Sequence, residues 1–195
     1  MAQAMREIVR FALLLVALLA FPGSSVAHRL DEYLQATIVA IEPGDIRLHI
    51  NLTPGVAVAE PVLAMIDRNR DGAISTNEAT AYGEALKRDL RLRLDGRELK
   101  LKITASEFTT PAELRAGWGV IQMEFSASPR RFRDGAHTLA FENRHQTERS
   151  VYLFNAAQPG TGLVRITRQK RNANQSTGEI EFTFGVAPDS EQSFR

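Results

Sequence analysis

Residues 90–103 read LRLRLDGRELKLKI, and this stretch decides the fold. Leucines alternate with arginines over 90–94 and apolar residues alternate with lysines over 99–103, which is the two-residue period of a half-buried strand. Asp95-Gly96 stands between the two runs. This dipeptide is typical of a type I′ turn, because both central residues of that turn need positive φ. The stretch therefore predicts a β-hairpin with one face in a core.

Upstream of this hairpin the apolar period changes to that of a helix. Four residues recur at spacings of three and four, which places them on one face of a helix of about four turns. They are Ala79, Tyr82, Leu86 and Leu90. A shorter helix is expected to begin at Pro61, because proline suits the first helical position, where its missing N–H would have no partner. We therefore expect two helices inserted among strands, over about residues 61–90.

The twelve residues between these helices, 67–78, read DRNRDGAISTNE. They match the pattern D-x-[DN]-x-[DN]-G-x₅-E at every fixed position, and the segment therefore resembles the calcium-binding loop of the EF-hand family. Ile74 stands where that family has an inward apolar residue. The resemblance extends over about residues 61–90 and covers one loop, although the family normally places such loops in adjoining pairs.

The resemblance implies one Ca²⁺ site. This ion takes roughly six to eight oxygen ligands at about 2.4 Å, so the chain has to wrap around it, with a sharp bend at Gly72. The implied ligands are side-chain oxygens of Asp67, Asn69 and Asp71, the backbone carbonyl of Ala73, the hydroxyl of Ser75 directly or through water, and both carboxylate oxygens of Glu78. Only three of these residues are carboxylates, and Arg68 and Arg70 add positive charge. We therefore expect an affinity in the high micromolar to millimolar range.

Strand signals recur through the rest of the chain. Residues 46–52 alternate between apolar and polar, residues 33–41 are rich in apolar and β-branched side chains, and turn residues separate the two runs, which predicts an opening hairpin. Further strand-like runs lie at residues 118–126, 137–143, 151–155, 163–167 and 179–184. The polar residues 168–178 indicate a long hairpin loop.

About nine short strands, interrupted once by two helices, predict a mainly β (α+β) fold. We expect an antiparallel β-sandwich with an inserted EF-hand-type helix-loop-helix, in a single domain over residues 28–195. No Pro-, Gly- and Ser-rich linker divides this segment.

Residues 1–27 carry the parts of a secretory signal peptide in order. Arg6 and Arg10 give a basic start, residues 11–21 are apolar, and small residues at 25–27 suit a signal peptidase. The apolar run is shorter than the about twenty residues that a membrane-spanning helix needs. An uncleaved anchor or a buried helix is the alternative. Cleavage is expected to leave His28 first, in an exported protein that is periplasmic or extracellular and has no stable membrane insertion.

Composition narrows the classes of function. The chain has 24 Lys+Arg and 23 Asp+Glu, a near balance that disfavours nucleic acid as a partner, because phosphate binding needs a clear basic excess. Cysteine is absent, which excludes disulfides, thiolate zinc sites, iron–sulfur clusters and cysteine nucleophiles. Calcium is the one partner that the sequence indicates, and a protein partner is not identified by any motif.

A copper site is the first alternative to calcium. An N-terminal histidine offers both its α-amine and its imidazole to one metal, so His28 would become a ligand after signal cleavage. A second histidine would be needed, and His49, His137 and His145 are the candidates. The sequence brings none of them to His28.

A non-catalytic interaction domain is the second alternative. In that interpretation residues 67–78 form a solvated loop that binds no metal, and Thr76 acts only as the N-cap of the following helix. An enzyme is not expected, since the chain lacks the motifs of serine hydrolases, zinc proteases, phosphate loops and dinucleotide-binding folds. The paired carboxylates Glu179 and Glu181 alternate with apolar residues, which is typical of the wet side of a strand.

A second resemblance involves residues 28–34, the loop 67–78 and residues 90–99. Together they are similar to exported β-rich domains that precede the membrane helices of hydrogenase- and urease-accessory nickel-permease-like proteins. No apolar run in the chain after the signal segment reaches spanning length. No function is therefore carried over from this resemblance.

Overall fold

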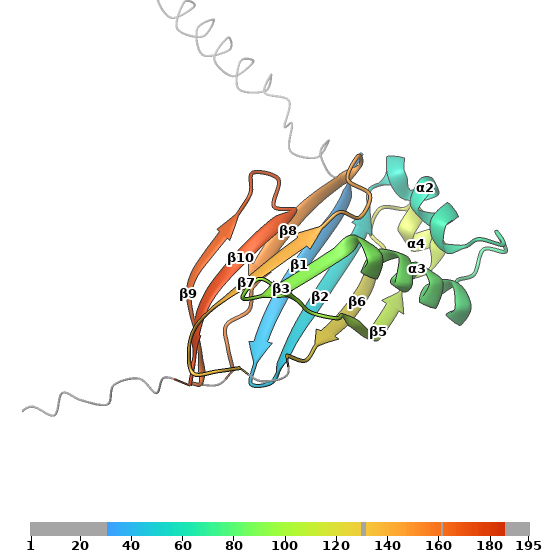
Figure 1. The fold of residues 1–195 in the computed structure, drawn as a ribbon. Helices are drawn as coiled ribbons and strands as arrows, with labels where there is room; N and C mark the ends of the chain where they lie inside the picture. Colours follow the sequence, from blue (N-terminus) through green and yellow to red (C-terminus); the bar gives the residue numbers. More distant parts are fainter. Residues whose placement is uncertain (1–30, 130–131, 161, 186–195) are drawn as a thin grey trace, which may run out of the picture.

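The computed structural model describes residues 31–129, 132–160 and 162–185. The expected signal peptide 1–27, His28 and the end of the chain lie outside these residues. In the described part, two five-stranded sheets pack face to face, and three helices gather at one end of them (Figure 1). The predicted mainly β fold is confirmed.

The first sheet has the strand order β5-β6-β2-β1-β8 and the second the order β4-β3-β7-β10-β9. The strands of the first sheet are β1 (Tyr33–Glu42), β2 (Asp45–Pro54), β5 (Lys102–Phe108), β6 (Ile121–Ala127) and β8 (Ser150–Ala156). Those of the second are β3 (Leu90–Leu94), β4 (Arg97–Glu98), β7 (Gly135–Asn143), β9 (Val164–Arg171) and β10 (Thr177–Phe184). The helices are α2 (Val56–Ile66), α3 (Thr76–Asp89) and α4 (Pro111–Arg115).

The hairpin predicted around Asp95-Gly96 is present, but its second arm is much shorter than expected. Asp95 has φ 49° and Gly96 has φ 76°, as a type I′ turn requires. β4 ends at Glu98, and the chain then joins the other sheet as β5. The expectation of one strand over 99–103 is therefore wrong. The apolar residues of this segment are instead partly buried where the chain crosses between the sheets, packed against the core.

The strand pairing departs from the predicted antiparallel arrangement at one place. β1 pairs with β2 in antiparallel register, as the opening hairpin predicts, but it pairs with β8 in parallel. Parallel neighbours cannot be joined by a tight turn. Between β1 and β8 the chain forms β2 to β7 and all three helices, so local sequence patterns do not indicate this pairing.

The outer edge of β8 is covered by side chains of β9 and of the turn between β9 and β10. The Nε2 of Gln169 donates to the carbonyl of Phe154 at 3.2 Å, and its Oε1 accepts from the backbone N–H of Ala156 at 3.1 Å. Gln175 accepts from the N–H of Phe154 at 3.3 Å. These carboxamides occupy backbone groups that a further strand would otherwise pair with, and they also link the two sheets.

The polar segment 168–178 is mostly strand, so the predicted long loop is wrong. β9 continues to Arg171 and β10 begins at Thr177. Lys170 forms ion pairs with Glu179 at 2.9 Å and with Glu181 at 2.8 Å on the outer face of the sheet. The outward face of a sheet needs no apolar residues. The polar residues of this edge strand therefore lack the apolar–polar alternation by which a strand is predicted from sequence.

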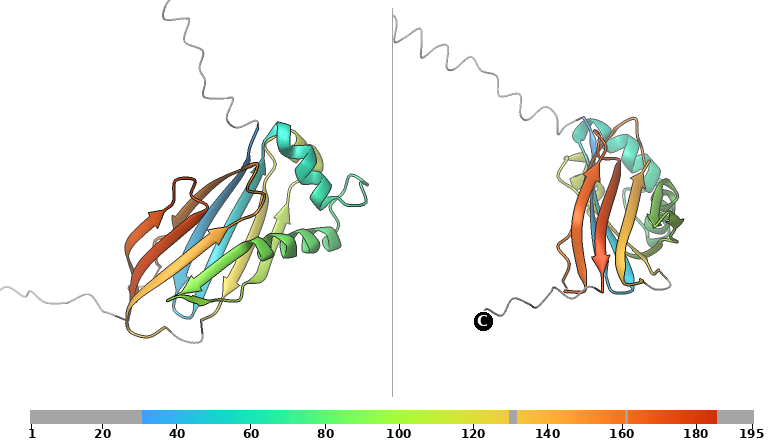
Figure 2. Two further views of the ribbon diagram at one scale, coloured as in Figure 1. Left: turned by 45° about the horizontal axis from the view of Figure 1, so that its top comes forward. Right: turned by 60° about the vertical axis from the view of Figure 1, so that its left-hand side comes forward.

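Two features of the helices differ from expectation. α2 begins at Val56 rather than at Pro61, with Gly55 as its N-cap, so Pro61 lies inside the helix on an exposed face. α4 was not predicted; it is a single turn capped by Thr110 and Glu113. α3 runs straight into β3, as the sequence indicates (Figure 2). Among the described residues, no helix combines the length and apolarity needed to cross a membrane.

Candidate metal centre

The loop 67–75 connects α2 to α3 at the helical end of the sandwich. α2 ends at Ile66, and the N–H of its C-cap Asp67 still donates to the carbonyl of Leu63 at 2.8 Å. α3 begins after Ser75, which is the N-cap, so the alternative placement of the cap at Thr76 is wrong by one residue. Five of the six residues implied as ligands therefore lie in the loop between the two helices, and Glu78 lies in the first turn of α3.

The first half of the loop is folded by its own acidic side chains. Asp67 is only 6% exposed, and its two carboxylate oxygens accept from the N–H groups of Asp71 at 3.2 Å and Gly72 at 3.0 Å. Asn69 Oδ1 also accepts from the Asp71 N–H, at 3.1 Å. These bonds hold the carboxylate of Asp67 and the amide oxygen of Asn69 against backbone N–H groups of the same loop.

Backbone conformation in the middle of the loop explains the glycine. Gly72 has φ 81°, and a Cβ added at this position would meet no atom within 4 Å. The glycine is therefore needed for its left-handed backbone and not for lack of space. Arg70 also has positive φ, at 60°. Two left-handed residues within three positions make the sharp reversal that the sequence predicts at this point.

Glu78 closes the loop from its other end. Its Oε1 accepts from the N–H of Arg68 at 2.8 Å and of Asn69 at 3.3 Å, while its Oε2 accepts from the N–H and hydroxyl of Ser75 at 3.0 and 2.7 Å. Ser75 returns the contact by accepting from the Glu78 N–H, which completes a capping box. These bonds, led by the one from the Ser75 hydroxyl, lower the pKa of Glu78 to about 2.

Ile74 lies at the foot of the loop, partly buried against the hydrophobic core. The neighbouring residues Leu63 and Ile66 of α2 and Leu86 of α3 are fully or almost fully buried in that core. The two helices that flank the loop are thus packed against the core of the sandwich. Ile74 is partly covered by the same core, without a partner chain.

The donor set suits a hard cation, but the loop is held by hydrogen bonds. Carboxylate, amide, hydroxyl and carbonyl oxygens are the ligands that Ca²⁺ prefers. Within residues 31–129, 132–160 and 162–185, no group of three or more His, Asp or Glu side chains is arranged to hold a metal ion. The oxygens of Asp67 and Glu78 point to loop amides instead. A calcium ion would have to take these oxygens from their present donors.

The histidines considered for copper lie in three separate environments. His49 faces Glu124 at 3.4 Å on the first sheet. His137 contacts Asp95 and the Arg133 carbonyl, and His145 is buried against α3. No two of them share a hydrogen-bond partner in the described part of the chain, and His28 lies outside it.

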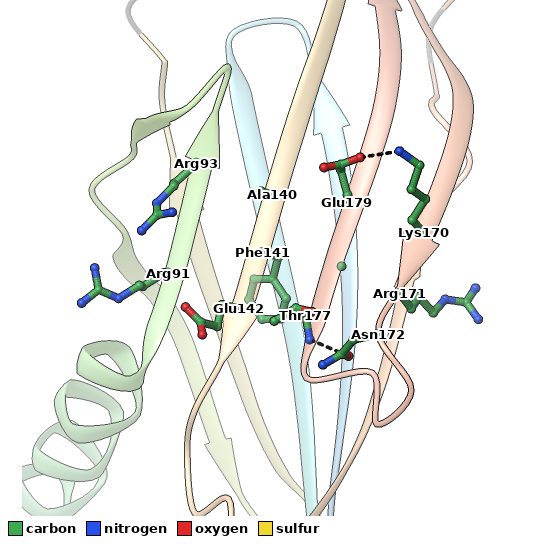
Figure 3. Close-up of a pocket in the computed structure, with 11 residues that line it drawn as sticks. Arg91, Arg93, Ala140, Phe141, Glu142, Lys170, Arg171, Asn172, Thr177 and Glu179 are labelled. Atoms are coloured by element: carbon green, nitrogen blue, oxygen red, sulfur yellow. Dashed lines mark hydrogen bonds and ion pairs between the residues drawn. The ribbon is translucent and has the colours of Figure 1, made fainter.

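A groove of about 470 Å³ crosses the outer face of the second sheet (Figure 3). Arg91 and Arg93 on β3 lie on one side of it, and Lys170 on β9 lies on the other. Several of its charges have partners: Lys170 contacts Glu179, and Arg91 contacts Glu98 at 3.5 Å. The pairing of Glu179 and Glu181 with lysine agrees with the interpretation of both carboxylates as the wet side of a strand.

One buried polar cluster is not indicated by any pattern in the sequence. It consists of Tyr33 on β1, Tyr82 and Asp89 on α3, and His145 in the loop before β8. In the sequence, Tyr82 belongs to the apolar face of a predicted helix, and His145 is one of several histidines without a motif. No motif links residues this far apart, so the only available signal was the presence of ionisable groups in core-facing segments.

No protein-family model, curated protein or solved structure matches this chain.

Proposed function

We propose that this chain binds one calcium ion through residues 67–78 and acts as an exported, non-enzymatic calcium-binding protein. Its ligands would be Asp67, Asn69, Asp71, the Ala73 carbonyl, Ser75 and Glu78. The observation that carries the proposal is the position of Glu78, whose carboxylate reaches back across the loop to the start of the same twelve-residue segment. A ligand at the last position can close a shell only if it faces the first.

The hydrogen bonds of the loop also bear on affinity. Ca²⁺ would compete with the four donors that Glu78 now accepts from and with the amides that hold Asp67. The Ser75 hydroxyl would have to release Glu78 before it could turn an oxygen to the ion. Arg68 and Arg70, both exposed, add positive charge beside the loop. These competing hydrogen bonds and positive charges support a low calcium affinity, as in extracellular calcium sites. The ion would then have a structural role or act in a weak calcium sensor.

Isothermal titration of the protein with Ca²⁺ at fixed ionic strength tests the proposal. The expected result is one ion per chain, with Mg²⁺ binding more weakly because it keeps its water shell. Glu78→Gln removes a bidentate carboxylate and should abolish measurable binding, while Ser75→Ala should weaken it less. Glu84→Gln is the matched control, since Glu84 lies on α3 but outside the loop and pairs with Lys87.

Two results would contradict the proposal. One is the absence of heat on titration with millimolar Ca²⁺, which would favour a loop that binds no metal. The other is an equal affinity of Glu78→Gln and the parent chain, which would place any bound ion elsewhere. A parallel titration with Cu²⁺ distinguishes the copper alternative, because copper binding would be insensitive to Glu78→Gln.

A further inference from the structure

Four polar side chains meet where α3 packs on the sandwich. His145 Nδ1 lies 2.7 Å from Asp89 Oδ2, and His145 Nε2 lies 3.2 Å from the Tyr82 hydroxyl. The Tyr82 hydroxyl in turn contacts the hydroxyl of Tyr33. Tyr33 is 0% exposed, and Tyr82 and His145 are each 2% exposed. The cluster is therefore a water-poor contact between one helix, one strand and one loop.

The hydrogens in this cluster can be counted. A carboxylate only accepts, so His145 Nδ1 must carry a hydrogen and donate it to Asp89. In the neutral imidazole Nε2 is then an acceptor, Tyr82 donates to it, and Tyr33 donates to Tyr82. Every hydrogen has an acceptor and every contact has one hydrogen. With neutral His145, no hydrogen in this cluster is left without an acceptor.

Protonation of His145 adds one hydrogen for which the cluster has no acceptor. Nε2–H would then donate to Tyr82, so the two contacts Nε2–Tyr82 and Tyr82–Tyr33 would have three hydrogens between them, and the hydroxyl hydrogen of either Tyr82 or Tyr33 would be left over. Among the described residues, Tyr33 Oη has the Tyr82 hydroxyl as its one hydrogen-bond partner. A buried donor without an acceptor is unfavourable, so the added proton forces a contact in the cluster to open.

We propose that Tyr33, Tyr82, Asp89 and His145 form a proton-sensitive latch. With His145 neutral, the latch holds α3 against β1 and the loop before β8. With His145 protonated, the contact of Tyr82 with His145 or with Tyr33 opens and α3 loosens, while Nδ1–H still donates to Asp89. Since α3 also carries Glu78, acidification would weaken calcium binding too, a consequence that rests on the proposed function.

Charged groups around His145 act in both directions. A groove beside it is lined by side chains of α2, the loop after α2, α3 and the loop before β8. Tyr152 of β8 donates to the His145 carbonyl at 2.8 Å. The titratable and charged groups that line this groove or contact the cluster are Arg68, Tyr82, Glu84, Arg88, Asp89, Tyr33 and Tyr152. Asp89 favours the imidazolium, but its side chain is 42% exposed and partly screened by water.

Burial outweighs Asp89 in its effect on the imidazole, and it lowers the pKa of His145 below the ordinary value of 6.5. The unfolded or opened state therefore binds the proton more readily than the latched state. Stability from the latch is present above pH 6.5 and is lost as the pH falls from 6.5 to the folded pKa. His137 has the opposite sign, since its pKa is raised by the Arg133 carbonyl and Asp95, and acidification strengthens its contacts.

Amide hydrogen exchange of the calcium-free protein, in chelator, tests the latch between pH 7.5 and 5.5. After correction for the intrinsic rate, protection of α3 amides should fall as pH falls, by at most about tenfold per pH unit for one proton. Protection of β7 and β10 serves as the internal reference and should change less. A parallel NMR titration of the His145 ring should give a pKa below 6.5.

Two variants separate a latch from a passive core contact. Asp89→Asn keeps an acceptor for Nδ1 but removes the charge that favours the imidazolium, so loosening of α3 should move to lower pH. His145→Gln cannot gain a proton, so its α3 protection, though lower overall, should no longer depend on pH in this range. His137→Gln is the control and should leave the pH dependence of α3 in place.

Unchanged α3 protection across this pH range in the parent chain would overturn the proposal, and so would a His145 pKa at or above 6.5. An Asp89→Asn profile that coincides with the parent profile would do the same, and this variant remains informative if His145→Gln does not fold. The experiment contains no calcium, so its outcome is independent of the proposed function. A separate fall in Ca²⁺ affinity at pH 5.5 tests only the further consequence.

Discussion

Glu78 accepts a hydrogen bond from the backbone N–H of Arg68 at 2.8 Å, which ties the first turn of α3 to the chain just after α2. The contact spans ten residues and is made by a single carboxylate. It fixes the helix-loop-helix from both ends without a metal ion, and for this reason Glu78 matters to stability as well as to the proposed calcium site.

Acidification should reveal this role of Glu78. Its pKa is lowered to about 2 from a model-compound value of 4.5, so its stabilising bonds are present above pH 4.5 and lost as pH falls from 4.5 to 2. Glu78→Gln should lower the melting temperature at pH 6 and change it much less at pH 2. Thermal unfolding followed by circular dichroism measures this. A variant-to-parent difference that stays constant across that range would rule out the ionised carboxylate as the cause.

Calcium should stabilise the folded chain by mass action. When free Ca²⁺ is a hundredfold above the dissociation constant, binding to the folded state alone contributes about 2.7 kcal/mol to the free energy of unfolding. Differential scanning calorimetry should show a melting temperature that rises with Ca²⁺ in the parent chain and in Glu84→Gln. In Glu78→Gln it should not rise. Confirmed 1:1 binding without any rise would mean that the unfolded chain binds equally well.

The chain should remain a monomer with and without calcium. Ile74 is already partly buried against the core, so it does not need the loop of a second copy to cover it. Light scattering should give the same mass in calcium and in chelator. Ile74→Ala should lower the free energy of unfolding by about 1 kcal/mol, less than the roughly 2–5 kcal/mol of a fully buried isoleucine. A calcium-dependent dimer that Ile74→Asp abolishes would show that pairing of two loops covers this residue instead.

Gly178 should not tolerate a side chain. A Cβ added there would lie 2.1 Å from the ring of Phe154, which stacks on Phe141 with ring centroids 5.4 Å apart. Gly178→Ala is therefore expected to lower the free energy of unfolding by about 1–3 kcal/mol, measured by urea titration. Gly160→Ala is the control, because its new methyl group meets nothing within 4 Å. Equal stability of the two variants would show that Phe154 moves aside freely.

Much of the local structure could be predicted from the sequence, for reasons specific to each segment. Asp95-Gly96 predicted its turn because both residues adopt positive φ there. The apolar spacing through Tyr82 and Leu86 predicted α3, since one face of a helix must enter the core. The residues of the candidate calcium loop also lie within twelve positions, so their proximity follows from chain connectivity. That they bind calcium stays a prediction.

The sequence by itself determined the mainly β class, the opening hairpin, the two helices and the loop between them, because turn chemistry and periodicity act over a few residues. Only the tertiary structure decided the parallel pairing of β1 with β8, the passage of the chain from β4 to the other sheet, and the strand character of 168–171. It alone brought His145 to Tyr82 and Tyr33. These features depend on contacts between residues far apart in the chain, where burial in a shared core, rather than local preference, selects the arrangement.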